Sequence, residues 1–340
     1  MTRVLILYTG GTAGMGKEPG QGYRPIPGFL EKMMRRIPLF QEPEVPAWEI
    51  HQYDPLLDSS DMRPRHWSRI ARDIQAAYED YDGFLVVHGT DTMAYTASAL
   101  SFMLRGLRKP VLLTGSQIPL SETRNDALDN LLTALLLIGR FHDRLAEVCV
   151  FFDNTLYRGN RTTKIHTEGF DAFASPDFPP LGEVGIDFEL NQGLLRPRPD
   201  AARELKVCEI GETTVGAFRV FPGLRVSFLE ALLAPPVQGL VLECFGAGNA
   251  PTDPELMAAL RAARDRGVVV VAVPQPLYGA ANLELYANGR ALLEAGVVSG
   301  RDMTVEAALA KLFYLYARGF GPQQVRSQVQ LDLRGELTEP

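Results

Sequence analysis

The chain has 340 residues, 46% of them hydrophobic, and a formal net charge of −7 with a pI near 5.4. This length is typical of two domains that each bury a core, and the acidic balance argues against a nucleic-acid-binding surface. Cys149, Cys208 and Cys244 are odd in number and widely spaced without a CxxC pair, so neither a disulfide framework nor a zinc cluster is indicated.

The N-terminal sequence does not resemble a targeting segment. Only five apolar or aromatic residues, 4–8, follow Arg3 before the first glycines, which is too short for the hydrophobic region of a signal peptide. The sequence also contains no apolar run long enough to span a bilayer. We therefore expect a soluble cytoplasmic protein without a membrane or nucleic-acid partner.

A glycine-rich stretch, YTGGTAGMG at residues 8–16, follows a short apolar run that is predicted to form a buried strand. Glycines at the carboxyl end of a strand let the backbone adopt positive φ and bring a ligand close to main-chain N–H groups. The stretch has neither the G-x-G-x-x-G spacing of a dinucleotide site nor a P-loop with its lysine. Thr12 in this turn could be a nucleophile, a helix N-cap or a turn residue.

The next segment, residues 17–29, is rich in glycine and proline and carries Tyr23. We expect it to lack secondary structure and to be a lid, a binding loop or ordered coil. A helix is predicted over 30–37 and a strand over 48–55, which leads into LLDSSDM at 56–62. Ser59 and Ser60 could cap the helix that begins near Pro64, or they could present two hydroxyls to the same crevice as Thr12.

Three further strands are predicted before residue 170, and each ends in polar residues. A helix over 65–81 leads to a continuously apolar strand at 83–87 that ends in HGTD at 88–91. A helix over 93–107, a strand over 109–119 and a helix over 123–139 follow, and a strand over 147–164 ends at Lys164. This alternation predicts an α/β fold with a mostly parallel sheet and helices on both faces.

The polar clusters at the strand ends are expected to meet. Ligands of open α/β sheets bind outside the carboxyl ends of the strands, so clusters that follow different strands can converge on one rim. The clusters are Thr12, the pair Ser59 and Ser60, the pair Thr90 and Asp91, and Lys164. Four independent placements on one rim favour an active site over four separate structural roles.

The middle of the chain, residues 171–213, loses helical periodicity and gains proline, arginine and aspartate, which indicates a linker. We set the N-terminal catalytic α/β domain at 1–188, the linker at 189–213 and a smaller C-terminal α/β domain at 214–340. In the last segment, strands and helices alternate again, and two helices are predicted to close the chain.

The clustered residues allow a specific chemistry, although a threonine hydroxyl is a weak nucleophile that needs a base or a pre-organised network. His88 follows a buried strand and is expected to be a hydrogen-bonded structural histidine. Lys164 is either a solvated loop lysine or, in a partly desolvated site, a proton acceptor. Between Thr90 and Asp91 it would complete a relay, and backbone N–H groups near Gly89 would stabilise an oxyanion. We predict acyl transfer, most simply hydrolysis of an ester or amide.

Metal chemistry is not indicated by the sequence. The five histidines show no HExxH or other ligand spacing, and the pair Asp58 and Asp61 alone is a weak signal. We expect neither a metal nor a cofactor.

Four motifs together resemble the bacterial-type asparaginase and glutaminase family. They are YTGGTAGMG at 8–16, DSSDM at 58–62, VVHGTDTMAYTAS at 86–98 and RGNRTTK at 158–164. GLVLECFGAGNAP and the region from PQPLYG to VVSG resemble the family's C-terminal domain, so the resemblance spans nearly the whole chain. HGTDTMAYTASALSF and DSSDM are most similar to the cytoplasmic type I branch.

The resemblance implies a two-domain amidohydrolase without a cofactor. Thr12 would attack the side-chain amide carbon of L-asparagine, releasing ammonia and leaving a β-aspartyl ester that water hydrolyses to L-aspartate. Thr90, Asp91 and Lys164 would complete the catalytic set, with Tyr23 on a lid over Thr12. The residues expected to hold the α-carboxylate and α-ammonium groups are Asp58, Ser59, Ser60, Thr90 and Asp91. A homodimer, or a dimer of dimers, is also implied.

Three alternatives remain open at this point. A dual-specificity glutaminase-asparaginase differs by one methylene of substrate length, which is worth only about 1–3 kcal/mol in a pocket. The subunit of a tRNA-dependent amidotransferase that uses this fold normally has an additional N-terminal domain, for which a TGGT motif at residue 9 leaves no room. A non-catalytic amino-acid sensor would have no need of both threonines and the lysine.

Overall fold

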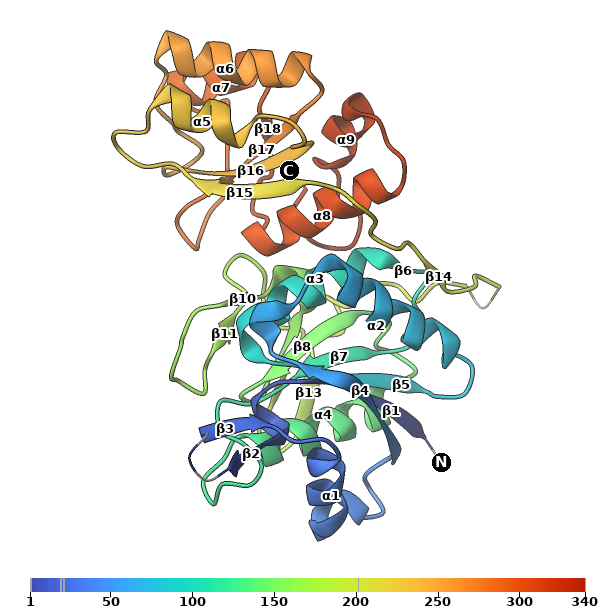
Figure 1. Ribbon diagram of the computed structural model, residues 1–340. Coiled ribbons are helices and arrows are strands. Elements are labelled where there is room, and N and C mark those ends of the chain that lie inside the picture. Colours follow the sequence, from blue (N-terminus) through green and yellow to red (C-terminus); the bar gives the residue numbers. More distant parts are fainter. Residues whose placement is uncertain (1, 19, 21, 201, 340) are drawn as a thin grey trace. The chain divides into compact units, whose positions relative to one another are not determined.

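The computed structural model describes residues 2–18, 20, 22–200 and 202–339, which form two compact units, Met1–Val207 and Cys208–Pro340. We call them the N-terminal and the C-terminal unit, and each contains its own sheet with helices packed against it (Figure 1). Part of the predicted linker, residues 189–207, lies in the N-terminal unit.

The described part of the N-terminal unit builds an eight-stranded sheet in the order β13-β12-β9-β8-β7-β5-β1-β4. The five strands from β8 to β4 are mutually parallel, and β9, β12 and β13 are antiparallel. The sheet strands are β1 (Arg3–Gly10), β4 (Ala47–Leu57), β5 (Gly83–Val87), β7 (Val111–Thr114), β8 (Val148–Phe152), β9 (Thr155–Arg158), β12 (Gly182–Val184) and β13 (Phe188–Leu190). The predicted fold class, a mostly parallel α/β sheet in the larger unit, is confirmed.

Three short ladders and five 3₁₀ turns complete this unit. The paired strands are β2 (Met15–Glu18) with β3 (Gly22–Pro25), β6 (Leu104–Arg105) with β14 (Lys206–Val207), and β10 (Thr163–Lys164) with β11 (Phe173–Ala174). The turns of the described chain are η1 (Thr12–Gly14), η2 (Pro38–Gln41), η3 (Ser59–Asp61), η4 (Thr90–Thr92) and η5 (Gly159–Arg161).

Helices cover both faces of the large sheet (Figure 1). On one face, α1 (Phe29–Arg36) and α4 (Ala127–Phe141) bury leucine and methionine side chains against Ile6, Leu85 and Leu112 of the strands. On the other face lie α2 (Pro64–Ala76) and α3 (Met93–Met103). In α3 every side chain except Tyr95 is buried, as expected for a helix that is apolar all round.

The C-terminal unit has a four-stranded sheet within the described residues, in the order β15-β16-β17-β18, with every pair parallel. Its strands are β15 (Val215–Arg219), β16 (Gly239–Cys244), β17 (Val269–Pro274) and β18 (Val298–Ser299). Its helices are α5 (Val226–Leu232), α6 (Pro254–Asp265), α7 (Ala287–Ala295), α8 (Val305–Ala317) and α9 (Pro322–Gln328). The predicted smaller α/β domain at the end of the chain is therefore also confirmed.

The predicted single strand over 147–164 is wrong. The chain turns back after β8 at Asp153 and Asn154, both of which have positive φ, and returns as the antiparallel strand β9. Two consecutive left-handed residues match the tight turns that suit the twist of a hairpin. Lys164 therefore does not follow the carboxyl end of a parallel strand; it follows η5, which packs against α3, and lies in β10.

Two further predictions of irregular structure are corrected. The expected loop at 17–29 contains the hairpin of β2 and β3, in which Met15 pairs with Pro25 and Lys17 with Tyr23. The expected linker at 171–213 contributes β11, β12 and β13, and β12 pairs with β9 at the edge of the large sheet. Strands of two to four residues carry too little alternation to be recognised before their partners are known.

The turns after β1 and β5 approach each other closely. Gly11 has φ of 91°, and a Cβ built on it would lie 2.4 Å from the backbone nitrogen of Gly89. A Cβ on Gly89 would in turn lie 2.5 Å from the hydroxyl oxygen of Ser59. Only glycine fits at such backbone contacts, and these two bring the residues after β1, β4 and β5 together.

Gly11→Ala is therefore expected to lower the free energy of unfolding by about 3 kcal/mol or more, because the methyl group combines unfavourable φ with a backbone clash. Gly28→Ala is the matched control: Gly28 has φ of 72°, but nothing lies within 4 Å of a Cβ built there. The control should lower the free energy of unfolding by only about 1–2 kcal/mol, which is the effect of the left-handed conformation alone. Urea unfolding of both variants measures the difference, and equal losses would contradict the close contact.

Candidate active site

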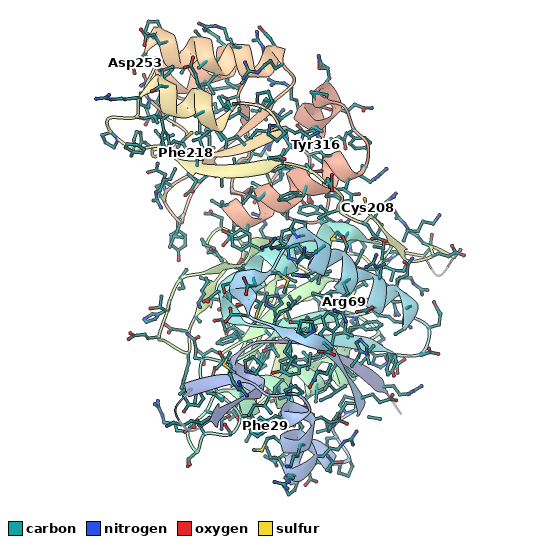
Figure 2. All side chains as sticks on the ribbon, viewed as in Figure 1. Phe29, Arg69, Cys208, Phe218, Asp253 and Tyr316 are labelled. Carbon is teal, nitrogen blue, oxygen red and sulfur yellow. The ribbon has the colours of Figure 1, made fainter. Side chains whose placement is uncertain are left out.

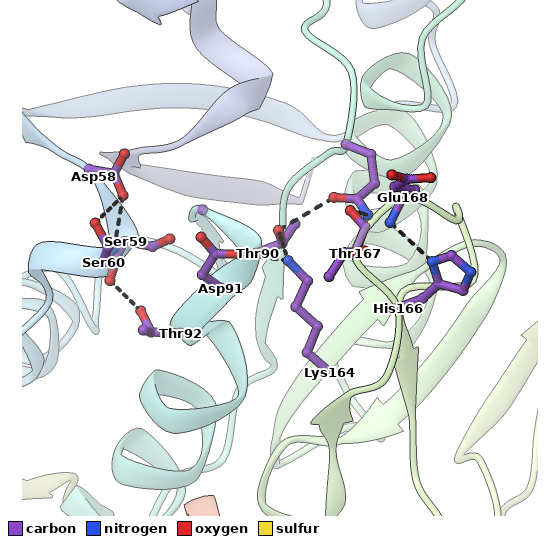
Figure 3. A network of polar contacts seen from close by, with 12 residues as sticks. Asp58, Ser59, Ser60, Thr90, Asp91, Thr92, Lys164, His166, Thr167 and Glu168 are labelled. Carbon is purple, nitrogen blue, oxygen red and sulfur yellow. Dashed lines mark hydrogen bonds and ion pairs between the residues drawn. The ribbon is translucent and has the colours of Figure 1, made fainter.

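Lys164 connects two residues that follow β5. Its Nζ donates hydrogen bonds to Thr90 Oγ1 at 2.8 Å and to Asp91 Oδ1 at 2.7 Å (Figure 3). Thr90 is buried at the start of η4, and α3 follows this turn directly. The hydroxyl, amine and carboxylate expected to converge are thus in direct contact, although Lys164 reaches them by a different path from the one predicted.

This ion pair is only partly withdrawn from water. The side chain of Lys164 is 18% exposed, and that of Asp91 is 65% exposed. An ion pair with so exposed a partner contributes little to stability, because water screens it. The exposed carboxylate of Asp91 remains accessible to a cationic group of a ligand, while the amine is held against the buried hydroxyl of Thr90.

The segment after β4 presents a second polar cluster. Asp58 Oδ1 accepts hydrogen bonds from the backbone N–H and from the hydroxyl of Ser60, both at 2.8 Å. Ser59 is buried beside Gly89, and its carbonyl accepts a hydrogen bond from Thr92 Oγ1 at 2.7 Å (Figure 3). The serines do not cap α2, whose N-cap is Arg63; instead Asp58 caps the turn η3.

Thr12 begins the turn η1 and is half-buried. It immediately follows Gly11, whose backbone touches Gly89, so Thr12 lies at the same rim as the cluster of Thr90. Among the described residues its hydroxyl has no hydrogen-bond partner. Thr12 does not cap a helix, because the N-cap of η1 is Gly11.

Tyr23 lies on β3, a strand in contact with η1. Its side chain is 44% exposed, and its hydroxyl donates a 2.7 Å hydrogen bond to Glu122. The Lys17 amine lies 5.7 Å from the centroid of its ring. These contacts lie within and beside the hairpin that neighbours Thr12. They do not include Lys164, Thr90 or Asp91.

Gln117, which the sequence analysis did not identify, joins the cluster from the segment after β7. Thr90 Oγ1 donates to Gln117 Oε1 at 3.5 Å, and Gln117 Nε2 donates to the carbonyls of Thr167 at 3.2 Å and Gly169 at 3.0 Å. The buried carboxylate of Asp126 accepts from the Gln117 backbone N–H at 2.9 Å. Its position among the polar residues near the end of the strand predicted over 109–119 was the available signal.

His88 is a structural residue beneath the site, as expected. It is buried, with Nδ1 2.7 Å from the carbonyl of Gly89 and Nε2 2.9 Å from Thr96 Oγ1, which accepts from Trp67 Nε1 at 3.1 Å. Because a carbonyl only accepts, the proton resides on Nδ1, and Nε2 accepts from Thr96. Burial lowers the pKa of His88 to about 4, so the imidazole is neutral and holds the carbonyl next to Thr90.

The described residues show neither a cluster of metal ligands nor a membrane-spanning helix. No group of three or more His, Cys, Asp or Glu side chains in that part of the chain is arranged to hold a metal ion. Within the same residues, none of the helices has the length and apolar character required to cross a membrane.

Comparison with known proteins places both units in one family. Residues 3–196 match the model of the N-terminal asparaginase domain, and residues 214–328 match the C-terminal domain of glutaminases and asparaginases. The chain belongs to the asparaginase family. The resemblance inferred from the four motifs is thereby confirmed.

Individual members of the asparaginase family are similar over their full length. L-asparaginase 1 of Escherichia coli K12 is 49% identical, with 98% of both chains covered. The crystal structure of L-asparaginase I from Vibrio cholerae has a TM-score of 0.91 at 48% identity and covers 99% of each chain. The thermostable L-asparaginase of Thermococcus kodakarensis has a TM-score of 0.87 at 33% identity over 100% of both chains.

The depressed pKa of His88 predicts a specific dependence of stability on pH. The unfolded state, with a histidine pKa of 6.5, binds a proton that the folded state excludes until the pH reaches about 4. Stability from this group is therefore complete above pH 6.5 and is lost as pH falls toward 4. Between pH 7 and about pH 5, His88→Gln should lose about 2 kcal/mol less unfolding free energy than the original chain.

Urea unfolding at the two pH values measures this difference. His51→Gln, at an exposed position of β4, is the matched control and should keep the pH dependence of the original chain. If His88→Gln and the original chain lost the same free energy, the buried neutral imidazole would be disproved.

Proposed function

We propose that this chain is an L-asparaginase, which hydrolyses the side-chain amide of L-asparagine to L-aspartate and ammonia. The observation that carries the proposal is the contact of Lys164 Nζ with Thr90 Oγ1 and Asp91 Oδ1, beside the turn that bears Thr12. Membership of the asparaginase family supports the same activity.

In the proposed first step, Thr12 Oγ1 forms a bond to the side-chain carbonyl carbon of asparagine. The hydroxyl proton passes to the amide nitrogen, the C–N bond breaks, and ammonia leaves a β-aspartyl ester on Thr12. Backbone N–H groups near Gly89 and Thr90 are suited to stabilise the negative charge on the carbonyl oxygen, because they precede a helix.

In the proposed second step, water attacks the ester carbon, the bond from this carbon to Thr12 Oγ1 breaks, and aspartate leaves. The proton released by the water is proposed to reach Thr12 Oγ1 by way of the hydrogen-bonded pair of the Thr90 hydroxyl and Lys164 Nζ. The 2.8 Å separation between Thr90 Oγ1 and Lys164 Nζ is within range for this transfer. Asp91 and Gln117 orient the amine and the hydroxyl respectively.

The α groups of the substrate have complementary partners at the same rim. The carboxylates of Asp58 and Asp91, both exposed, suit the α-ammonium group. The hydroxyls of Ser59 and Ser60, together with the backbone N–H groups of their turn and the segment at Thr90, suit the α-carboxylate. Tyr23 is proposed to act from a hairpin lid, which would require its hydroxyl to leave Glu122.

The assembly and location are proposed from the family resemblance. We propose a homodimer or a dimer of dimers in the cytoplasm. Size-exclusion chromatography with light scattering measures the assembly directly, and a monomer at micromolar concentration would disprove it.

Ammonia release from the purified protein with L-asparagine and with L-glutamine tests the activity. A strong preference for asparagine, measured as kcat/KM, is expected. Comparable turnover of glutamine would identify the dual-specificity alternative. No turnover of either amide, in a protein that still binds asparagine, would identify the amino-acid sensor.

Thr12→Ala is expected to lower kcat at least about a thousandfold, because it removes the attacking oxygen. Binding of asparagine, measured by calorimetry, and the unfolding temperature should change little. Thr12→Ser is the matched control and should retain measurable turnover. Substantial turnover by Thr12→Ala would assign the nucleophile to another residue.

Lys164→Met is expected to lower kcat by about 10²–10⁴-fold with a much smaller change in KM, because the amine transfers a proton and does not hold the substrate. Lys32→Met, an exposed position on α1, is the matched control and should leave both constants unchanged. Steady-state kinetics with L-asparagine measures the split. A large rise in KM at unchanged kcat would make Lys164 a binding residue instead.

A further inference from the structure

A cavity lies beside the segment that bears Asp58, Ser59 and Ser60. It has a volume of about 300 Å³ and is formed by the end of β4, the turn η3 and the first turns of α2. The residues that line it are Pro55, Leu57, Asp61, Arg63, Arg65, His66 and Arg69. Arg69, on α2, is marked in Figure 2.

The charge of this cavity is uncompensated. Three guanidinium groups face a single carboxylate, that of Asp61, in a chain whose net charge is −7. In the part of the chain that the structure describes, none of the three arginines is in an ion pair. The first turn of α2 contains no acidic residue, so these cations also oppose the positive end of the helix dipole. Water screens the exposed Arg63 and Arg65 in part, and a bound anion would offset the repulsion that remains.

The hydrogen bonds of His66 indicate where the anion would bind. The backbone N–H of Arg63 points to His66 Nδ1 at 3.1 Å, and the Nε–H of Arg65 points to Nε2 at 3.2 Å. A neutral imidazole has only one acceptor nitrogen, so it can satisfy one of these two donors. The other donor is left facing a ring N–H. An anion oxygen at this edge of the ring would accept a hydrogen bond from that donor.

Two further features are consistent with a formed site. The pKa of His66 is lowered by burial and then by the positive charges of Arg65, Arg63 and Arg69, which outweigh the opposing effect of Asp61. The Arg69 guanidinium is held 4.1 Å from the centroid of the buried Tyr53 ring, so its orientation is fixed in the absence of a ligand. A pre-oriented cation loses little entropy on binding an anion.

We propose that this cavity binds a small oxyanion, of the phosphate or carboxylate class, and that its occupancy changes the affinity for the amide substrate. Leu57 and Asp61 line the cavity, and Asp58, Ser59 and Ser60 lie between them in the sequence. A shift of this short segment on anion binding moves groups proposed to hold the substrate. The second half of the proposal rests on the proposed function, whereas anion binding itself does not.

Calorimetric titration with sodium phosphate and with sodium succinate, at ionic strength matched with sodium chloride, tests the binding. Saturable binding at one site per chain is expected. The anion that binds shows whether the cavity takes a phosphate or a carboxylate. The double variant Arg63→Gln/Arg65→Gln should weaken binding by about tenfold or more, because charge-assisted hydrogen bonds are lost. Arg36→Gln, an exposed arginine of α1, is the matched control and should bind as the original chain does.

Absence of saturable binding of both anions, or equal affinity in the double variant, would overturn the proposal. The coupling is tested separately by the KM for L-asparagine with and without the bound anion. A change of roughly fivefold is expected in the original chain and none in the double variant. An unchanged KM would overturn the coupling alone. If the protein did not hydrolyse asparagine, the proposed function would be disproved. The titration would still show whether the cavity binds an anion.

Discussion

The close approach of backbone turns at the carboxyl ends of β1, β4 and β5 is the constraint on which the site depends. Parallel strands about 4.8 Å apart bring successive turns side by side, and side chains at the contact would separate them. Gly11 and Gly89 remove that obstacle, so Thr12, Ser59 and Thr90 meet at one rim. The groups proposed to be catalytic are therefore positioned by the backbone, and the hydrogen bonds of their side chains refine this arrangement.

Around this rim the buried titratable group is neutral and the charged groups are partly exposed. Beneath it, His88 is kept neutral by burial, and its two hydrogen bonds hold the carbonyl before Thr90. At the surface, Asp91 keeps one side of its carboxylate in water while pairing with Lys164. The cavity at α2, next to Asp58, Ser59 and Ser60 in the chain, is lined mainly by cationic groups. The two proposed sites would therefore offer charges of opposite sign to a ligand.

Much of this arrangement could be predicted from particular residues. The apolar run at 83–87 followed by HGTD predicted a buried strand that ends in polar residues, and the four motifs identified the family. The path to Lys164 could not be predicted in the same way. Asp153 and Asn154 form a hairpin turn, but in the sequence they lie inside a long run that is compatible with one strand. Whether this run forms one strand or a hairpin depends on its pairing with a distant part of the sheet.

The sequence by itself determined the fold class and the family, and it predicted a set of reactive residues, because hydrophobic periodicity and short motifs are local properties. Only the tertiary structure decided how those residues meet. The approach of Gly11 to Gly89, the support of Thr90 by Gln117, and the contact of Arg65 with His66 depend on distances below about 4 Å. Most such distances join elements far apart in the chain, and local sequence carries no record of them until the sheet has set strand order and register.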